Sequence, residues 1–337
     1  MKHLDSCIDA LIAEGTADNI AVKIGRRDDV LVELYRGDVN ENTLFDMASV
    51  SKIIATTSLA LMALERGRIS LADKVSQYFT CPPEREAITV LHLLTHTIGI
   101  GHKSLNQDGT TYENVAEQIL RIPSDIPIGS DVRYSCPGFI LLGKILEKVF
   151  DSPLDLLLKE KVCLPLGMTS TGYLPTEKAL AVNSNLTEKL RGTVNDYNCR
   201  HLGGVAGNAG IFSNISDMTR FVGMLLDEGR PILSSSILEE ARKNHTPAMS
   251  EARGLGFLYV DERYKQTGGL FPVGSFGHCG HTGQSVFVDP ESGLYAIILS
   301  DATVSTARKY GRENYAEVIA MRAAVHASAK QDLFGTV

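Results

Sequence analysis

The stretch FDMASVSKIIATTSLALMALER, residues 45–66, begins with an S-x-x-K pattern formed by Ser49 and Lys52. From Ser49 onward it is rich in strong helix formers and stops before Gly67, which predicts a helix over about 49–66. On a helix, Ser49 and Lys52 share one face, with Cβ atoms about 5–6 Å apart. A serine needs a nearby base to become a nucleophile. The stretch therefore predicts a nucleophilic serine with a lysine beside it.

Lys52 can act as a base only if its pKa falls well below the free value of about 10.4, and burial has that effect. The apolar neighbours Phe45, Met47, Ile53 and Ile54 favour burial of the lysine. Taken alone, the pattern fits a helix-capping serine and a solvated lysine equally well. The rest of the chain must decide between these readings.

Strand patterns occur near both ends of the chain, and helical spacing dominates the middle. A first helix over residues 4–12 precedes a β-hairpin at 20–36, and a last helix covers about 312–328. Further strand patterns lie at 254–260, 285–289 and 294–300. This order predicts an α/β (α+β) fold with one antiparallel β-sheet flanked by N- and C-terminal helices.

The same pattern predicts two lobes. Residues 1–66 and 203–337 form a discontinuous α/β sheet lobe, residues 67–202 form a mainly helical lobe, and we expect the active site in the cleft between them. The glycine-rich run at 203–210 lacks the Lys-Ser/Thr of a P-loop. We interpret it as close backbone packing beside that cleft.

Several segments occur in an order typical of one superfamily. They are FDMASVSK (45–52), LLTHTIGI (93–100), RYS (133–135), LPLGM (164–168) and GHTG (280–283). With them the chain resembles the serine β-lactamase and penicillin-binding-protein superfamily, specifically its class C-like branch of esterases, D-amino-acid peptidases and carboxypeptidases, over about residues 18–301. The resemblance implies a β-lactamase/transpeptidase-like fold and an acyl-enzyme on Ser49, with Lys52 as the partner lysine.

The resemblance also implies a tyrosine that shuttles protons with the lysine, and Tyr134 matches it. Two positions later, Cys136 replaces the asparagine that lactamases and carboxypeptidases use to bind the amide of the acyl side chain. A thiol is a weak donor and a poor acceptor. Cys136 therefore remains a candidate substrate-binding residue, but it weakens the β-lactamase and peptidase readings.

A third element, K-T-G on a strand in lactamases, is represented by His281-Thr282-Gly283. The resemblance implies that His281 acts at the catalytic site, that Thr282 and Gly283 bind substrate, and that the N–H groups of Ser49 and Gln284 form the oxyanion hole. Histidine is not a permanent cation as lysine is. This replacement again favours esters or small amides over penicillins.

These features predict a serine hydrolase that acts through an acyl-enzyme on Ser49, most directly on carboxylic esters or small amides. A D-amino-acid peptidase, carboxypeptidase or β-lactamase with the same residues is the alternative. From another class, the chain is a catalytically silent binding module of the same fold. Retention of Ser49, Lys52 and Tyr134 together argues against that last reading.

Composition narrows the choice of partners. The formal charge is −7 and no basic stripe is present, which argues against nucleic acid. No apolar run approaches the roughly 20 residues of a bilayer span, and no signal peptide precedes residue 20 if Met1 is the natural start. We expect a cytoplasmic protein with free cysteines, a small-molecule ester, amide or β-lactam substrate, and no metal or organic cofactor. The pair His92 and His96 has the spacing of metal ligands but lacks a third ligand.

Overall fold

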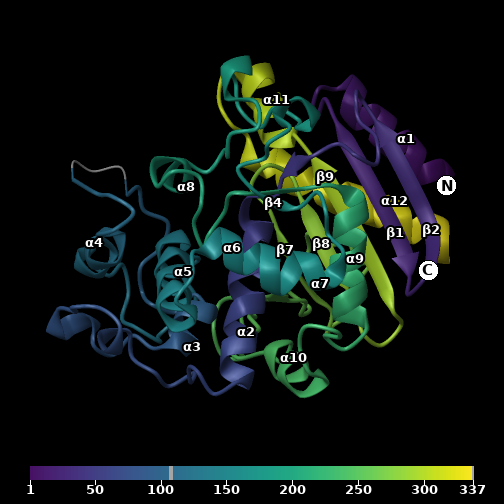
Figure 1. Cartoon of the computed structure of the whole chain (residues 1–337). Coiled ribbons are helices and arrows are strands. Elements are labelled where there is room, and N and C mark those ends of the chain that lie inside the picture. Colours follow the sequence, from purple (N-terminus) through teal and green to yellow (C-terminus); the bar gives the residue numbers. More distant parts are fainter. Residues whose placement is uncertain (106–108, 336–337) are drawn as a thin grey trace.

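The computed structural model describes residues 1–105 and 109–335. Its larger sheet has six strands in the order β2-β1-β9-β8-β7-β6, and every neighbouring pair is antiparallel. The strands are β1 (Ile20–Arg26), β2 (Asp29–Arg36), β6 (Leu258–Tyr259), β7 (Phe276–Cys279), β8 (Ser285–Val288) and β9 (Leu294–Ser300). The predicted antiparallel sheet made from both ends of the chain is confirmed (Figure 1).

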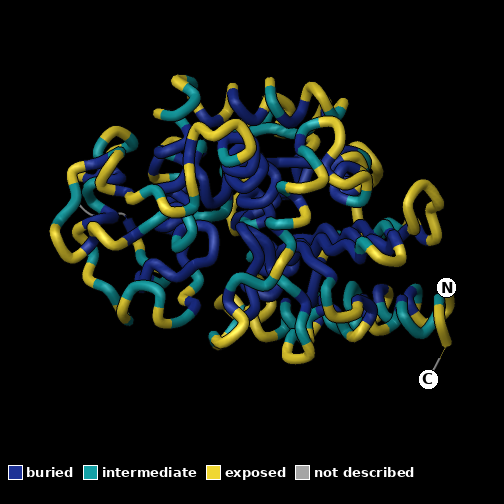
Figure 2. Tube along the Cα trace, turned by 90° about the horizontal axis from the view of Figure 1, so that it is seen from below, coloured by how far each residue is buried: buried dark blue, intermediate teal, exposed yellow. Residues whose placement is uncertain are grey.

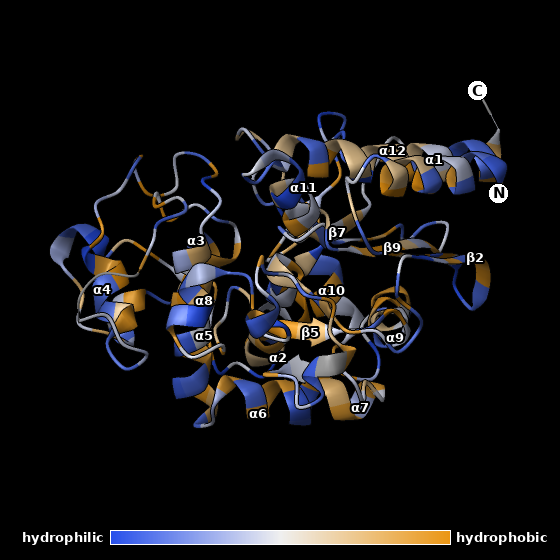
Figure 3. Ribbon diagram, turned by 90° about the horizontal axis from the view of Figure 1, so that it is seen from above, coloured by the Kyte–Doolittle hydropathy of each residue, from blue (hydrophilic) through white to orange (hydrophobic). Residues whose placement is uncertain are grey.

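Helices cover both faces of this sheet. On one face α1 (Lys2–Ala13) and α12 (Tyr315–Phe334) lie side by side, and α9 (Ile215–Leu226) contacts the sheet from the other face (Figures 1 and 3). Strand β1, next to the edge strand β2, is therefore buried along most of its length. The apolar residues of α1 and α12 that face the sheet form one core cluster with it.

Most of the remaining helices contribute residues to the second, larger core cluster. Figure 2 shows that the buried residues lie inside the molecule and the exposed ones at its periphery. The helices of this cluster are α2 (Ser58–Glu65), α3 (Val90–Leu94), α4 (Val115–Arg121), α5 (Cys136–Phe150), α6 (Leu154–Leu158), α7 (Leu164–Leu166), α8 (Tyr197–His201) and α10 (Ser235–Ala241). Helix α11 (Ala302–Tyr310) follows β9 and contributes Ala302 to the cluster of the larger sheet. A small sheet in the order β3-β5-β4 joins β3 (Phe45–Asp46), β4 (Gly172–Tyr173) and β5 (Ile211–Ser213). These short strands were not predicted, because two or three residues carry too little periodicity.

The predicted helix at 49–66 is present, but it is not a regular α-helix throughout. It begins as a 3₁₀ turn at Ala48–Val50, continues as a π-helical segment at Lys52–Thr57 and becomes regular only in α2. Ala48–Glu65 is long and apolar enough to cross a membrane by length and composition, yet 83% of this segment is buried inside the protein. It is the central helix of the larger core cluster.

Candidate active site

Ser49 lies at the first turn of the central helix, directly after β3. The carboxylate of Asp46 accepts a hydrogen bond from the N–H of Ala48 at 2.9 Å, and Ala48 has a φ of +45°, in the left-handed region that non-glycine residues rarely adopt. Ser49 remains partly exposed between buried neighbours. The strained backbone of Ala48 and the buried carboxylate of Asp46 together hold the Ser49 hydroxyl at the protein surface.

Asp46 is itself an unusual buried acid. Burial raises its pKa to about 6, while the N–H groups of Asn195 and Ala48 act in the opposite direction. The backbone carbonyl of Asp46 accepts hydrogen bonds from Thr282 Oγ1 at 2.8 Å and Gln284 Nε2 at 2.6 Å. Asp46 therefore ties the serine segment to the turn that follows β7.

Lys52 is 0% exposed, and its ammonium group reaches Ser49. Its Nζ lies 3.0 Å from Ser49 Oγ, 2.9 Å from the carbonyl oxygen of Asn208 and 3.6 Å from Cys136 Sγ. The predicted serine–lysine contact is thus present. The π-helical segment starts at Lys52, and such widened turns are often found at functional sites.

The charge of Lys52 depends on its two acidic neighbours. Burial lowers the pKa of Lys52, but negative charge on Cys136 or Tyr134 raises it, and with those charges present the pKa lies above its ordinary value. Burial in turn raises the pKa of Cys136 and of Tyr134 above their ordinary values, although Lys52 opposes this. Asp196 also raises the pKa of Lys52, so burial is the influence that favours the neutral form of the lysine against these charges.

Tyr134 joins the same cluster. It stands just before α5, whose N-cap Ser135 accepts a hydrogen bond from the N–H of Gly138 at 3.0 Å. Lys52 Nζ lies 5.0 Å from the centre of the Tyr134 ring, and hydrogen bonding with Lys52 and Ser49 lowers the pKa of the phenol against the effect of burial. The structure therefore brings Ser49, Lys52, Tyr134 and Cys136 together, as the sequence predicted.

His281 does not join this cluster. Its side chain is 41% exposed, its Nε2 lies 3.0 Å from a carboxylate oxygen of Glu313, and its ring stacks on Tyr315 with centres 5.0 Å apart. Residues 281–283 form the turn between β7 and β8, not a strand. The prediction of a strand element at 281–283 is therefore wrong, because main-chain pairing ends at Cys279.

The predicted substrate contacts at this turn need the same correction. Thr282, Gly283 and Gln284 are all buried, and Gln284 is 0% exposed, so none presents a side chain to a substrate. Thr282 and Gln284 instead hold the Asp46 carbonyl. A Cβ on Gly283, which has a φ of +123°, would stand 2.0 Å from Ser300 Oγ. These residues anchor the turn and do not line the site.

The strand residues His278 and Cys279, followed by Gly280, take the place that was predicted for residues 281–283. The His278 ring lies 6.1 Å from the Tyr134 ring. A Cβ on Gly280 would approach Met47 O to 2.7 Å, so only glycine allows this close contact with the serine segment. The sequence contains H-x-G at both positions, and β7 was the strand that pattern analysis missed.

Two buried histidines flank Tyr134. His96 packs on the phenol ring with centres 4.5 Å apart, and its Nδ1 accepts a hydrogen bond from the N–H of Ser135 at 3.0 Å. Burial lowers the pKa of His96 and of His278 well below the usual range, and the positive charges of Arg253 and Lys52 act in the same direction. Both rings are therefore neutral at neutral pH and add no charge to the site.

The glycine-rich run closes the other side of the cluster. The backbone carbonyl oxygen of Asn208 accepts a hydrogen bond from Lys52. A Cβ on Gly207 would stand 2.1 Å from the Phe139 carbonyl oxygen. The predicted close backbone packing is thus present. The Asn208 side chain is fully buried and lies at Cys136, where its hydrogen bond lowers the pKa of the thiol against the effect of burial.

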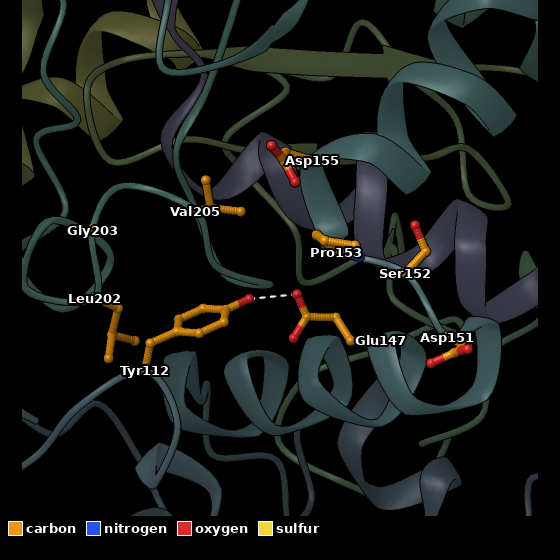
Figure 4. A pocket seen from close by; sticks show the side chains of 9 residues that line it. All are labelled: Tyr112, Glu147, Asp151, Ser152, Pro153, Asp155, Leu202, Gly203 and Val205. Atoms are coloured by element: carbon orange, nitrogen blue, oxygen red, sulfur yellow. Dashed lines mark hydrogen bonds between the residues drawn. The ribbon is translucent and has the colours of Figure 1, made fainter.

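A separate cavity of about 480 Å³ lies between α5, α6 and the start of the glycine-rich run (Figure 4). Tyr112, Glu147, Asp151 and Asp155 supply its polar lining. Tyr112 donates a hydrogen bond to Glu147, which also pairs with Lys144 at 2.7 Å. None of the residues that line this cavity belongs to the Ser49 cluster.

Comparisons with known proteins identify the family and the fold. A family model described as Beta-lactamase matches residues 4–320. A putative D-alanyl-D-alanine carboxypeptidase of Escherichia coli strain K12 is 28% identical over 300 residues, which cover 77% of this chain and 69% of the relative. The structure of EstCE1, a hydrolase with promiscuous acyltransferase activity, has a TM-score of 0.74 at 21% identity over 96% of this chain and 98% of its own. A penicillin-binding protein homologue from Caulobacter crescentus gives 0.76 at 17% identity, over 98% and 97%.

Proposed function

Because the chain belongs to the beta-lactamase family, whose members are hydrolases, we propose that it is a serine acyl hydrolase that reacts through Ser49. The observation that carries this proposal is the 3.0 Å contact between a fully buried Lys52 Nζ and the partly exposed Ser49 Oγ. A catalytically silent module would have no need to keep a lysine buried in this way, since burying a charge is costly.

In the proposed reaction, Ser49 Oγ attacks the carbonyl carbon of the substrate while neutral Lys52 accepts the hydroxyl proton. One N–H of Lys52 stays on the Asn208 carbonyl oxygen, which keeps the lone pair directed at Ser49. Tyr134, neutral because burial raises its pKa, donates its proton to the leaving group and is reprotonated from Lys52. Water then cleaves the acyl-enzyme and restores the serine.

The oxyanion that forms during this attack requires hydrogen-bond donors. We assign these to the backbone N–H groups of Ser49 and of His281, the residue after Gly280, in place of Gln284. Gly280 packs directly on the Met47–Ala48 backbone, whereas Gln284 is fully buried. In this assignment His281 contributes its main chain, and its side chain stays with Glu313.

The substrate class follows from Cys136. This residue replaces the asparagine of the family pattern, and its Sγ lies 3.6 Å from Lys52 Nζ, at the position where an acyl side chain would otherwise meet an amide. A thiol recognises an amide poorly. Simple carboxylic esters or small amides are therefore the proposed substrates. The Escherichia coli relative supports D-amino-acid carboxypeptidase activity as a second candidate.

Covalent labelling tests the proposal directly. We expect a fluorophosphonate to add one phosphonyl group to the wild-type protein and none to S49A, as measured by intact mass. Rates on p-nitrophenyl esters and on D-Ala-terminated peptides then separate the two substrate candidates. If the wild-type protein gains no mass and hydrolyses neither substrate class, the hydrolase proposal fails.

The K-T-G element was predicted at residues 281–283 and is now assigned to residues 278–280, and this change gives a second prediction. We expect H278A to lower kcat/KM for p-nitrophenyl acetate about 10²-fold, because it removes a ring that packs near Tyr134 in a buried site. H281A should lower it no more than about threefold, since the exposed side chain is lost but the N–H remains. A larger loss in H281A than in H278A would restore the original assignment of residues 281–283.

A further inference from the structure

Arg322 is a buried cation that has no role in the reaction proposed above. It lies on α12, is 0% exposed, and forms no ion pair with a carboxylate of the described residues. Its guanidinium donates instead to the carbonyl oxygens of Gly280 and of Gly283, the latter at 3.4 Å. On its other side it contacts Gln266 Oε1 at 3.1 Å and the Tyr315 hydroxyl at 3.4 Å. A fully buried arginine is rare without a charged partner.

The carbonyl oxygens that Arg322 binds belong to the turn 280–283, next to Ser49. Gly280 C=O and His281 N–H are parts of one peptide group, which is trans. In a trans peptide the C=O and N–H bonds point in opposite directions. Because Arg322 holds the C=O on the side of α12, the N–H of His281 must point away from that helix.

The side away from α12 is the side of the serine. Figure 3 shows α12 on one side of the larger sheet and α2 on the other. Gly280 packs against Met47 O and Ala48 Cβ, the two residues before Ser49. Thr303 fixes the other end of the same residue by donating its hydroxyl to the carbonyl oxygen of His281. Hydrogen bonds from Arg322 and Thr303 therefore hold the two carbonyl groups on either side of the His281 N–H along the chain.

We propose that Arg322 is a positioning residue, which turns the N–H of His281 toward the oxyanion formed on Ser49. The proposal rests on the acyl-hydrolase function proposed above. Arg322 acts through the Gly280 carbonyl and does not touch the substrate. Its hydrogen bonds also draw electron density to the Gly280 oxygen, which makes the N–H of the same peptide a stronger donor.

A pair of substrates that differ in one atom tests this role. Replacing the carbonyl oxygen of an ester by sulfur gives a thionoester. Because sulfur is larger than oxygen and accepts hydrogen bonds more weakly, it fits poorly between two N–H donors that are spaced for oxygen. The wild-type protein should therefore hydrolyse the oxygen ester much faster. In R322M we expect kcat for the oxygen ester to fall about 10²-fold, KM to stay within about twofold, and the oxygen-to-sulfur rate ratio to fall about tenfold. R322K, which keeps a charged donor, should lie between.

H326L is the matched control. His326 is one helical turn further along α12, is fully buried, and contacts Ser285 Oγ at 3.0 Å but not the turn 280–283. It should lose thermal stability, as R322M does, without changing the oxygen-to-sulfur ratio. An unchanged ratio in R322M, or the same fall in H326L, would overturn the positioning role. A wild-type protein that hydrolyses neither ester would instead overturn the acyl-hydrolase proposal, and the inference with it.

Discussion

Replacing Lys52 by methionine is expected to lower kcat/KM for ester hydrolysis about 10⁴-fold, the upper end of the range for general base catalysis. Methionine matches the length and apolar stem of lysine but cannot accept the proton of Ser49. The loss of Nζ also leaves the Asn208 carbonyl oxygen without its buried donor. Steady-state kinetics with p-nitrophenyl acetate measure the loss, and intact mass after fluorophosphonate treatment shows whether Ser49 still reacts.

Two further variants separate a base from a structural cation at this position. K52R keeps the positive charge but cannot deprotonate in a protein, so it should be as inactive as K52M. K144M removes a partly buried lysine of α5 that pairs with Glu147 and lies over the Tyr112 ring, and it should keep full activity. If K52R retained activity within tenfold of wild type, Lys52 would not be the base.

Y134F is expected to lower kcat about 10³-fold for amides and alkyl esters, because the leaving group then departs without a proton. Nitrophenolate leaves readily as an anion, so its ester should lose no more than about tenfold. The phenylalanine ring preserves the packing on His96. Rates for a series of esters with leaving groups of increasing basicity measure the difference between the two cases.

Y112F provides the control for this prediction. It removes a hydroxyl that donates to Glu147 in the separate cavity and should give the same rates as wild type for every leaving group. Equal losses for alkyl and nitrophenyl esters in Y134F would mean that Tyr134 shapes the site without donating a proton. Lys52 would then have to supply the proton by itself.

The contact between Ser49 and Lys52 was predictable because its geometry is local. Ser49 and Lys52 are three positions apart on one helix, so the sequence alone specifies that they can touch. Long elements with clear periodicity were also predictable, including α1, the hairpin β1–β2 and strand β9. The 3₁₀ and π-helical turns that open the helix at Ala48 and Lys52 leave no mark in the periodicity.

The error at His281 has a different origin. β7 is four residues long, contains glycine and histidine, and is buried on both faces, so it shows no alternation of apolar and polar residues. Without that strand, the two H-x-G sequences could not be told apart. Which of them meets the serine depends on where pairing with β8 ends, at Cys279 opposite Ser285.

Other residues around the candidate site could not be predicted from the sequence. Asn208, Arg253 and Arg322 are buried polar residues from distant segments. Asn208 contacts Lys52, Arg253 lies over the Tyr134 ring and Arg322 binds the Gly280 carbonyl oxygen, and nothing adjacent to them in the sequence indicates these contacts. Their proximity depends on β1 pairing with β9 and on helices closing over both faces of the sheet. The tertiary fold, and not a local motif, assembles this part of the site.

The pairing of β1 with β9 also determines the order of events during synthesis on the ribosome. β1 and β2 emerge long before β9, and an isolated hairpin is only marginally stable in water. The edge of β1 that faces away from β2 stays unpaired until β9 is made, and β9 lies far along the chain. At about 5–20 residues per second this delay is on the order of tens of seconds. The nascent chain therefore exposes the unpaired edge of β1 until β9 has been synthesised, and such an edge can pair with other chains.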